Sequence, residues 1–117
     1  MAKLPNYEKA FIDPAKIKDY ILSPSHPVGR FKMALFQKIG YTDKNWGQLI
    51  NDIRRYHLPI DAELIEKTEY GRKYAIKGKI QGPNGKTVLF KSIWIILEDE
   101  DMPRFITIYP EGGNNEI

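Results

Sequence analysis

The chain has 117 residues, no cysteine, two histidines and a formal net charge of +3 at pH 7. The length predicts one domain, residues 1–110, with a flexible C-terminal tail at 111–117. The missing cysteines exclude disulfides, thiol nucleophiles and thiolate zinc sites, and two histidines argue against a self-contained zinc site, so we expect neither metal nor cofactor.

The N-terminal segment, MAKLPNYEKAF, contains no apolar run of the kind that forms a signal peptide. No later stretch approaches the length that a membrane-spanning helix needs. We therefore expect a cytoplasmic protein that does not contact a membrane.

The first half of the chain has helical spacing. Asp13-Pro14 joins a capping residue to a proline at the first helical position, which predicts a helix that ends at Ser23-Pro24. Apolar residues at helical spacing predict two further helices, one from Pro27 or Gly29 to Gly40 and one from Thr42 or Asp43 to Leu58-Pro59.

The second half has the two-residue period of strands. Between residues 73 and 80, apolar residues alternate with lysines, which predicts a strand with one apolar and one basic face. Turn residues separate four such segments: Ala62 to Thr68, Lys73 to Ile80, Thr87 to Leu97 and Arg104 to Tyr109. We predict an α+β domain in which about three N-terminal helices pack on one face of a four-stranded antiparallel sheet, a meander.

The last predicted strand suggests which face is open. Alternation places Phe105, Thr107 and Tyr109 on one face, and Ile106 and Ile108 on the other, which is the natural core face. Thr107 and Tyr109 would then share the open face with the lysines of the preceding strands.

The register of the strand at 86–97 stays undecided. Both of its faces are largely apolar, so a central strand covered on both sides and a bulge that flips the register are equally compatible with it. The faces that Lys91 and Trp94 occupy follow from that choice, although Trp94 is expected in the core.

Charge is unevenly distributed along the chain. Seven basic residues fall between Lys67 and Lys91 against one acid, Glu69, and a block of four acids follows at residues 98–101. A basic stretch can attract phosphate backbones. The alternative is a solvated strand face whose lysines discourage edge-to-edge pairing.

Three segments carry a resemblance to a known family. They are "KIKDYILSPSHPVGRFKMALFQKIGY", "YGRKYAIKGKIQGPNGKTVLFKSIWII" and "PRFITIYP", within Lys16 to Pro110. They resemble the opening, middle and end of an uncharacterised bacterial domain family, which occurs as small stand-alone proteins, in toxin–antitoxin pairs and as the C-terminal tip of polymorphic toxins. The chain departs from the family pattern at Ile108, where the family carries a small residue.

The resemblance implies a fold and a function. Helices followed by a meander are similar to the fold of barnase-like, EndoU-like, colicin-type and RelE-like ribonucleases, which cleave RNA without a metal on the open face of their sheet. We therefore expect a toxin with RNA as its substrate and a cognate antitoxin or immunity protein as its partner. The alternative is a non-catalytic module that binds nucleic acid or protein, either a partner subunit or an inactive relic.

His26 is the first candidate for catalysis. Such a reaction needs a base for the 2′-hydroxyl proton, an acid for the leaving oxygen and cations for the charged phosphorane. His26 precedes a proline at a helix N-terminus, where free N–H groups favour an anion. Its alternative role is a local turn contact, and His57, at a helix C-terminus that favours a cation, is expected to be structural.

The remaining candidates are basic or hydroxyl residues. Lys32 matches the family's Gly-x-x-Lys pattern, and Thr107 and Tyr109 can reach one ligand from one strand face. With His26 these three form the expected catalytic set. Phosphate contacts are expected from Arg30, Arg72, Lys73, Lys91 and Arg104.

Overall fold

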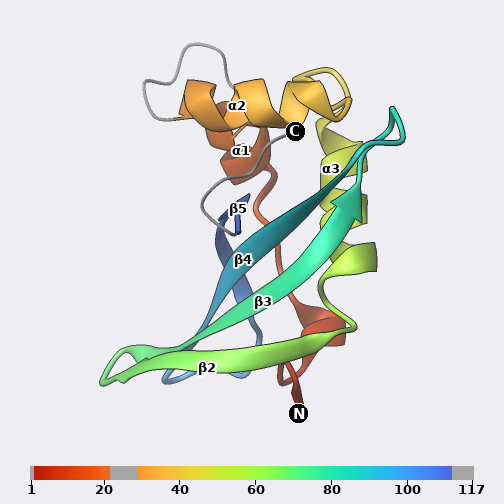
Figure 1. The fold of residues 1–117 in the computed structure, drawn as a ribbon. Helices are drawn as coiled ribbons and strands as arrows, with labels where there is room; N and C mark the ends of the chain where they lie inside the picture. The colour runs from red at the N-terminus through yellow and green to blue at the C-terminus, as the bar shows by residue number, and fades with distance from the viewer. Residues whose placement is uncertain (1, 22–28, 112–117) are drawn as a thin grey trace.

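The computed structural model describes the backbone at residues 2–21 and 29–111, and the side chains at 2–19 and 34–111. His26 and residues 112–117 of the predicted tail lie outside the described residues. The described chain forms a five-stranded antiparallel sheet in the order β1-β2-β3-β4-β5 (Figure 1). Its strands are β1 (Ala2–Lys3), β2 (Asp61–Thr68), β3 (Gly71–Gln81), β4 (Thr87–Leu97) and β5 (Arg104–Pro110).

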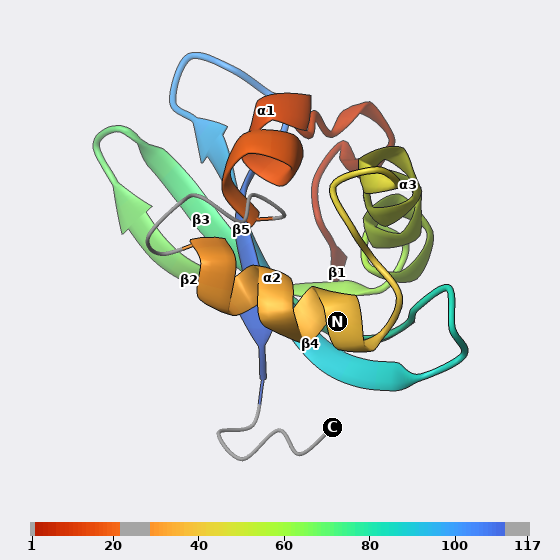
Figure 2. The ribbon, with the colours of Figure 1, turned by 90° about the horizontal axis from the view of Figure 1, so that it is seen from above.

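The helices gather beside this sheet, as the view from above shows (Figure 2). Asp13 caps α1 (Pro14–Lys16), since its Oδ1 accepts a hydrogen bond from the N–H of Ala15 at 3.0 Å. The helical segments are the 3₁₀ turn η1 (Tyr7–Lys9), α1 (Pro14–Lys16), the π-helical η2 (Ile17–Ile21), α2 (Gly29–Lys38) and α3 (Trp46–Tyr56).

The predicted α+β arrangement of about three N-terminal helices on a four-stranded meander is wrong. A fifth strand, β1, pairs with the start of β2 through Ala2↔Ala62 and Lys3↔Asp61. The first predicted helix keeps only three α-helical residues before it widens into η2, so the sheet is the dominant element. A two-residue strand is too short to show alternation, and apolar spacing over a few residues does not separate an α turn from a π turn.

The central pair of strands organises the core. β3 and β4 pair without a register shift from Gly71↔Leu97 to Gln81↔Thr87. Alternation therefore turns Ile76, Phe90 and Trp94 toward the helices, where all three are fully buried. Phe90 stacks on Phe36 of α2 with ring centroids 4.9 Å apart. The undecided register is thus settled, with Trp94 in the core and Lys91 on the opposite face.

A bulge shifts the alternation of the last strand. Thr107 lies opposite Ile93, but Phe105 lies opposite Trp94, so Ile106 is an extra residue between the two pairs. Phe105 and Ile108 both reach the core, at 3% and 0% exposure. The prediction that Ile106 is a core residue and that Phe105 shares the face of Thr107 is therefore wrong.

The turn between β3 and β4 packs on the C-terminus of α2. The Asn84 side chain donates to the carbonyl of Lys38 at 2.8 Å, and the Asn84 backbone N–H donates to the carbonyl of Ile39 at 3.3 Å. A Cβ on Gly82 would stand 1.9 Å from the same Ile39 oxygen, so only glycine permits this approach. The turn thereby satisfies carbonyl groups that a helix end leaves without partners.

The N-terminal segment reaches both edges of the sheet. β1 pairs with β2 at one edge, and Phe11 forms a parallel bridge to Arg104 of β5 at the other. The Phe11 N–H donates to the Pro103 carbonyl at 2.8 Å, and the Phe105 N–H donates to the Phe11 carbonyl at 2.9 Å. Residues 2–11 therefore pair with β2 on one side of the sheet and with β5 on the other.

Candidate functional site

The candidate site lies on the sheet face that points away from the helices, which we call the open face. The pleat places on it residues of one parity from each long strand. They include Lys73, Ala75, Lys77 and Lys79 of β3, Leu89, Lys91, Ile93 and Ile95 of β4, and Thr107 and Tyr109 of β5.

One cross-strand row on the open face concentrates charge and hydroxyl groups. Lys91 lies directly opposite Lys77 on β3 and directly opposite Tyr109 on β5. Side chains in such positions have Cβ atoms about 5 Å apart, so two lysines there repel each other. We call Lys77, Lys91 and Tyr109 the basic row.

Glu111 lies against the basic row. One of its carboxylate oxygens is 3.8 Å from the Lys77 Nζ, and the other is 3.9 Å from the Lys91 Nζ. The Glu111 backbone N–H donates to the Leu89 carbonyl at 3.0 Å, which fixes its Cα beside β4. The carboxylate thus offsets the repulsion between the two lysines.

Thr107 occupies the neighbouring row. It lies opposite Ile93, which is 8% exposed, and Ile93 lies opposite Ala75, which is 2% exposed. Thr107 and Tyr109 therefore share the open face, as their alternation predicts. Ile93 and Ala75 give the row of Thr107 an apolar floor next to the basic row.

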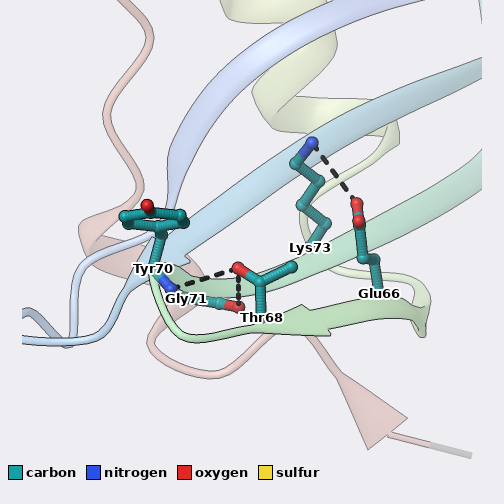
Figure 3. A network of polar contacts seen from close by, with 5 residues as sticks. All are labelled: Glu66, Thr68, Tyr70, Gly71 and Lys73. Atoms are coloured by element: carbon teal, nitrogen blue, oxygen red, sulfur yellow. Dashed lines mark hydrogen bonds and ion pairs between the residues drawn. The ribbon is translucent and has the colours of Figure 1, made fainter.

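Lys73 belongs to another part of the open face. It lies four residues along β3 from Lys77, which is about 13 Å at strand spacing. Its Nζ is 3.4 Å from Glu66 Oε1 on β2, and both side chains are about half exposed (Figure 3). Arg72 shares the parity of Tyr74 and so lies on the helix side, where it does not join the basic row.

Arg104 forms an ion pair with Glu100. The bulge in β5 places it opposite Ile95 on the open face. Its guanidinium donates two hydrogen bonds to the Glu100 carboxylate, at 2.8 and 2.9 Å, and these bonds hold the pKa of Glu100 below its usual range. The acidic turn before β5 therefore binds the arginine that sequence reasoning assigned to phosphate.

The structure does not describe the side chains of three candidate residues. Arg30 and Lys32 lie on α2 with side chains outside the described ranges, and His26 lies outside them altogether. Their roles stay predictions. Two residues of the site, Lys77 and Glu111, were missed by sequence reasoning, although Glu111 continues the alternation of Thr107 and Tyr109.

His57 has a structural role, but not the predicted one. It is fully buried at the end of α3, and burial lowers its pKa, which favours the neutral imidazole over the predicted cation. Nε2 lies 3.0 Å from the Gly78 carbonyl, which can only accept, so Nε2 carries the proton. Nδ1 then accepts from the Ser92 hydroxyl at 2.6 Å, and Ser92 Oγ accepts from Trp94 Nε1 at 2.8 Å.

Stability is expected to fall below about pH 6.5 because of His57. Burial lowers the pKa of His57 in the folded state. The unfolded chain therefore binds a proton first, and each pH unit between the unfolded pKa of about 6.5 and the folded pKa removes up to about 1.4 kcal/mol. Urea unfolding at pH 7.5, 6.5 and 5.5 measures this. The His57→Gln variant should lose the slope in that window, and an unchanged slope would contradict the assignment.

The described residues offer neither a set of metal ligands nor a membrane-spanning helix. No three histidine or acidic side chains of residues 2–19 and 34–111 gather as a set of metal ligands. Within the described part of the chain, no helix has the length and apolar character needed to cross a membrane.

Comparison with known proteins gives one family and one fold relative. The profile of a family described as "Domain of unknown function (DUF6883)" matches residues 3–112. No curated protein matches significantly. A solved structure described as a contact-dependent growth inhibition toxin – immunity protein complex from Klebsiella pneumoniae 342 contains a chain of similar fold, with a TM-score of 0.66 and 22% sequence identity. The similarity covers 92% of this chain and 97% of that chain.

Proposed function

The chain belongs to the DUF6883 family of domains of unknown function, and on this premise we propose that it is a toxin-type domain that cleaves RNA without a metal. The observation that carries the proposal is the basic row, which sets two lysines and a phenol side by side on the open face. The similar fold of a chain from a toxin–immunity complex supports a role in a toxin–immunity pair.

The proposed reaction is an internal transesterification. The 2′-oxygen forms a bond to phosphorus, the bond from phosphorus to the 5′-oxygen breaks, and the products are a 2′,3′-cyclic phosphate and a 5′-hydroxyl. A base takes the proton of the 2′-hydroxyl, and an acid gives a proton to the 5′-oxygen. His26 would serve as one of these groups and the Tyr109 phenol as the other.

The lysines of the basic row would stabilise the transition state. Lys77 and Lys91 project from adjacent strands at directly opposed positions, so both ammonium groups can approach one phosphate. The phosphorane carries more negative charge than the substrate does, so cations fixed there favour the transition state. Thr107, one row away, would orient the phosphate through its hydroxyl.

The proposal includes a protein partner. A toxin must be silenced in the cell that makes it, and a cognate immunity protein or antitoxin with an acidic face would meet the basic row. The competing function is a non-catalytic module that uses the same surface to bind nucleic acid or protein. It is favoured by Glu111, whose single carboxylate already offsets part of the positive charge of the two lysines.

Cleavage of tRNA and total RNA in EDTA tests the proposal. The wild-type protein is expected to release fragments with cyclic phosphate ends, and His26→Ala to cut about 10²–10⁴-fold more slowly, as for loss of a general acid or base. Intact RNA after incubation with the wild type would support the binding module. Equal cleavage by both proteins would remove His26 from the reaction and leave the ribonuclease assignment standing.

A further inference from the structure

A carboxylate lies against the two lysines of the basic row. Lys77 and Lys91 are directly opposed, and like charges at opposed positions are unfavourable unless a counter-charge lies between them. Glu111 supplies that charge, with its two oxygens divided between the two lysines. A group with two anionic oxygens can therefore interact with both ammonium groups at once.

The contacts of Glu111 are loose. The separations of 3.8 and 3.9 Å exceed the 2.7–3.2 Å of direct hydrogen bonds, so the carboxylate is held by charge attraction alone. The Lys77 side chain is 53% exposed and those of Lys91 and Glu111 are 24% exposed. Water and other anions can thus compete for the same ammonium groups.

The carboxylate can leave while the chain stays in place. The hydrogen bond from the Glu111 N–H to the Leu89 carbonyl anchors the backbone independently of the side chain. A change of rotamer is enough to vacate the site. Glu111 thus differs from Glu100, which binds Arg104 through two short hydrogen bonds.

We infer that Glu111 is an internal ligand of a phosphate site formed by Lys77 and Lys91, and that an RNA phosphate displaces it. The inference rests on the proposed function, since it names the group that regulates the same surface. RNA can bind only after the attraction between Glu111 and the two lysines is broken. The protein therefore binds phosphate less tightly than Lys77 and Lys91 would without Glu111.

A binding assay isolates this effect from cleavage. The probe is a fluorescent 2′-O-methyl oligonucleotide, which lacks the attacking hydroxyl and stays intact, and the readout is its anisotropy. Glu111→Gln is expected to bind about three- to tenfold more tightly than wild type, the range set by two surface ion pairs. Its affinity should also fall more steeply with salt, because more phosphate charge is neutralised by the protein.

A matched control removes the same charge elsewhere on the open face. Glu66→Gln frees Lys73, about 13 Å along β3 from Lys77, and should raise affinity less than Glu111→Gln does. Lys91→Ala should weaken binding and cancel most of the gain when combined with Glu111→Gln. Thermal unfolding of each variant checks that the fold is kept.

The outcomes separate the two ideas. Glu111→Gln binding no more tightly than Glu66→Gln, while Lys91→Ala weakens binding, would overturn the inference and leave the RNA surface in place. If Glu111→Gln binds the oligonucleotide as the wild type does but no longer cleaves RNA, Glu111 acts in proton transfer. That result would also overturn the inference. If neither Lys77→Ala nor Lys91→Ala changes the affinity for the oligonucleotide, RNA does not bind at the basic row. The inference and the proposed function would then both fail.

Discussion

Replacing Tyr109 with phenylalanine is expected to slow RNA cleavage by about 10²–10⁴-fold, because the change deletes only the hydroxyl that exchanges a proton. The ring is kept, so its packing beside Lys91 and the affinity for RNA should hardly change. Single-turnover rates with excess protein, together with affinities for the 2′-O-methyl probe, measure the two effects separately.

The control for this variant is Tyr70→Phe. Tyr70 lies in the turn between β2 and β3 (Figure 3) and is 72% exposed. Six residues of β3, about 20 Å at strand spacing, separate the adjacent Gly71 from Lys77. Tyr70→Phe should cleave at the wild-type rate. A Tyr109→Phe protein that cleaves as fast as wild type would show that the phenol takes no part in proton transfer.

Replacing Ser92 with alanine is expected to lower the free energy of unfolding by about 2–6 kcal/mol, although it removes a single oxygen atom. Ser92 is fully buried and links Trp94 to His57. Its loss leaves the indole N–H and the Nδ1 of His57 without partners, and each buried polar group left unpaired costs about 1–3 kcal/mol.

Urea unfolding at pH 7.5 measures this change. The matched control is Thr87→Ala, which removes a hydroxyl and a methyl from an exposed position on the same strand. It should cost less than about 1 kcal/mol. A Ser92→Ala protein that loses no more than the control would mean that the network finds other partners.

Local periodicity carried much of the information on β3 and β4. The alternation of lysines with apolar residues correctly predicted an apolar face of β3, which lies in the core, and Trp94 lies in the core as expected. Two features were invisible to alternation. β1 is two residues long, and the bulge at Ile106 inserts one residue without changing the composition of β5.

Part of the candidate site was predictable from alternation along a single strand. Parity along one strand placed Thr107 and Tyr109 together, and this needs no knowledge of other strands. Pairings between strands decided the rest. Lys77 becomes notable only because Lys91 lies opposite it, and Arg104 and Lys73 are taken up by Glu100 and Glu66. Net charge along the sequence does not reveal which cation already has an acidic partner.

The N-terminal segment also has a consequence for self-association. A sheet with free edge strands is a template on which other chains can add strands and aggregate. Here residues 2 and 3 cover the start of β2, and Phe11 covers the start of β5. The rest of β2 carries a bulge between Leu64 and Glu66 and several charges, which also oppose strand addition. One short segment therefore protects both sides of the sheet. If it detached, unpaired backbone groups of β2 and β5 would become available to other chains at the same time.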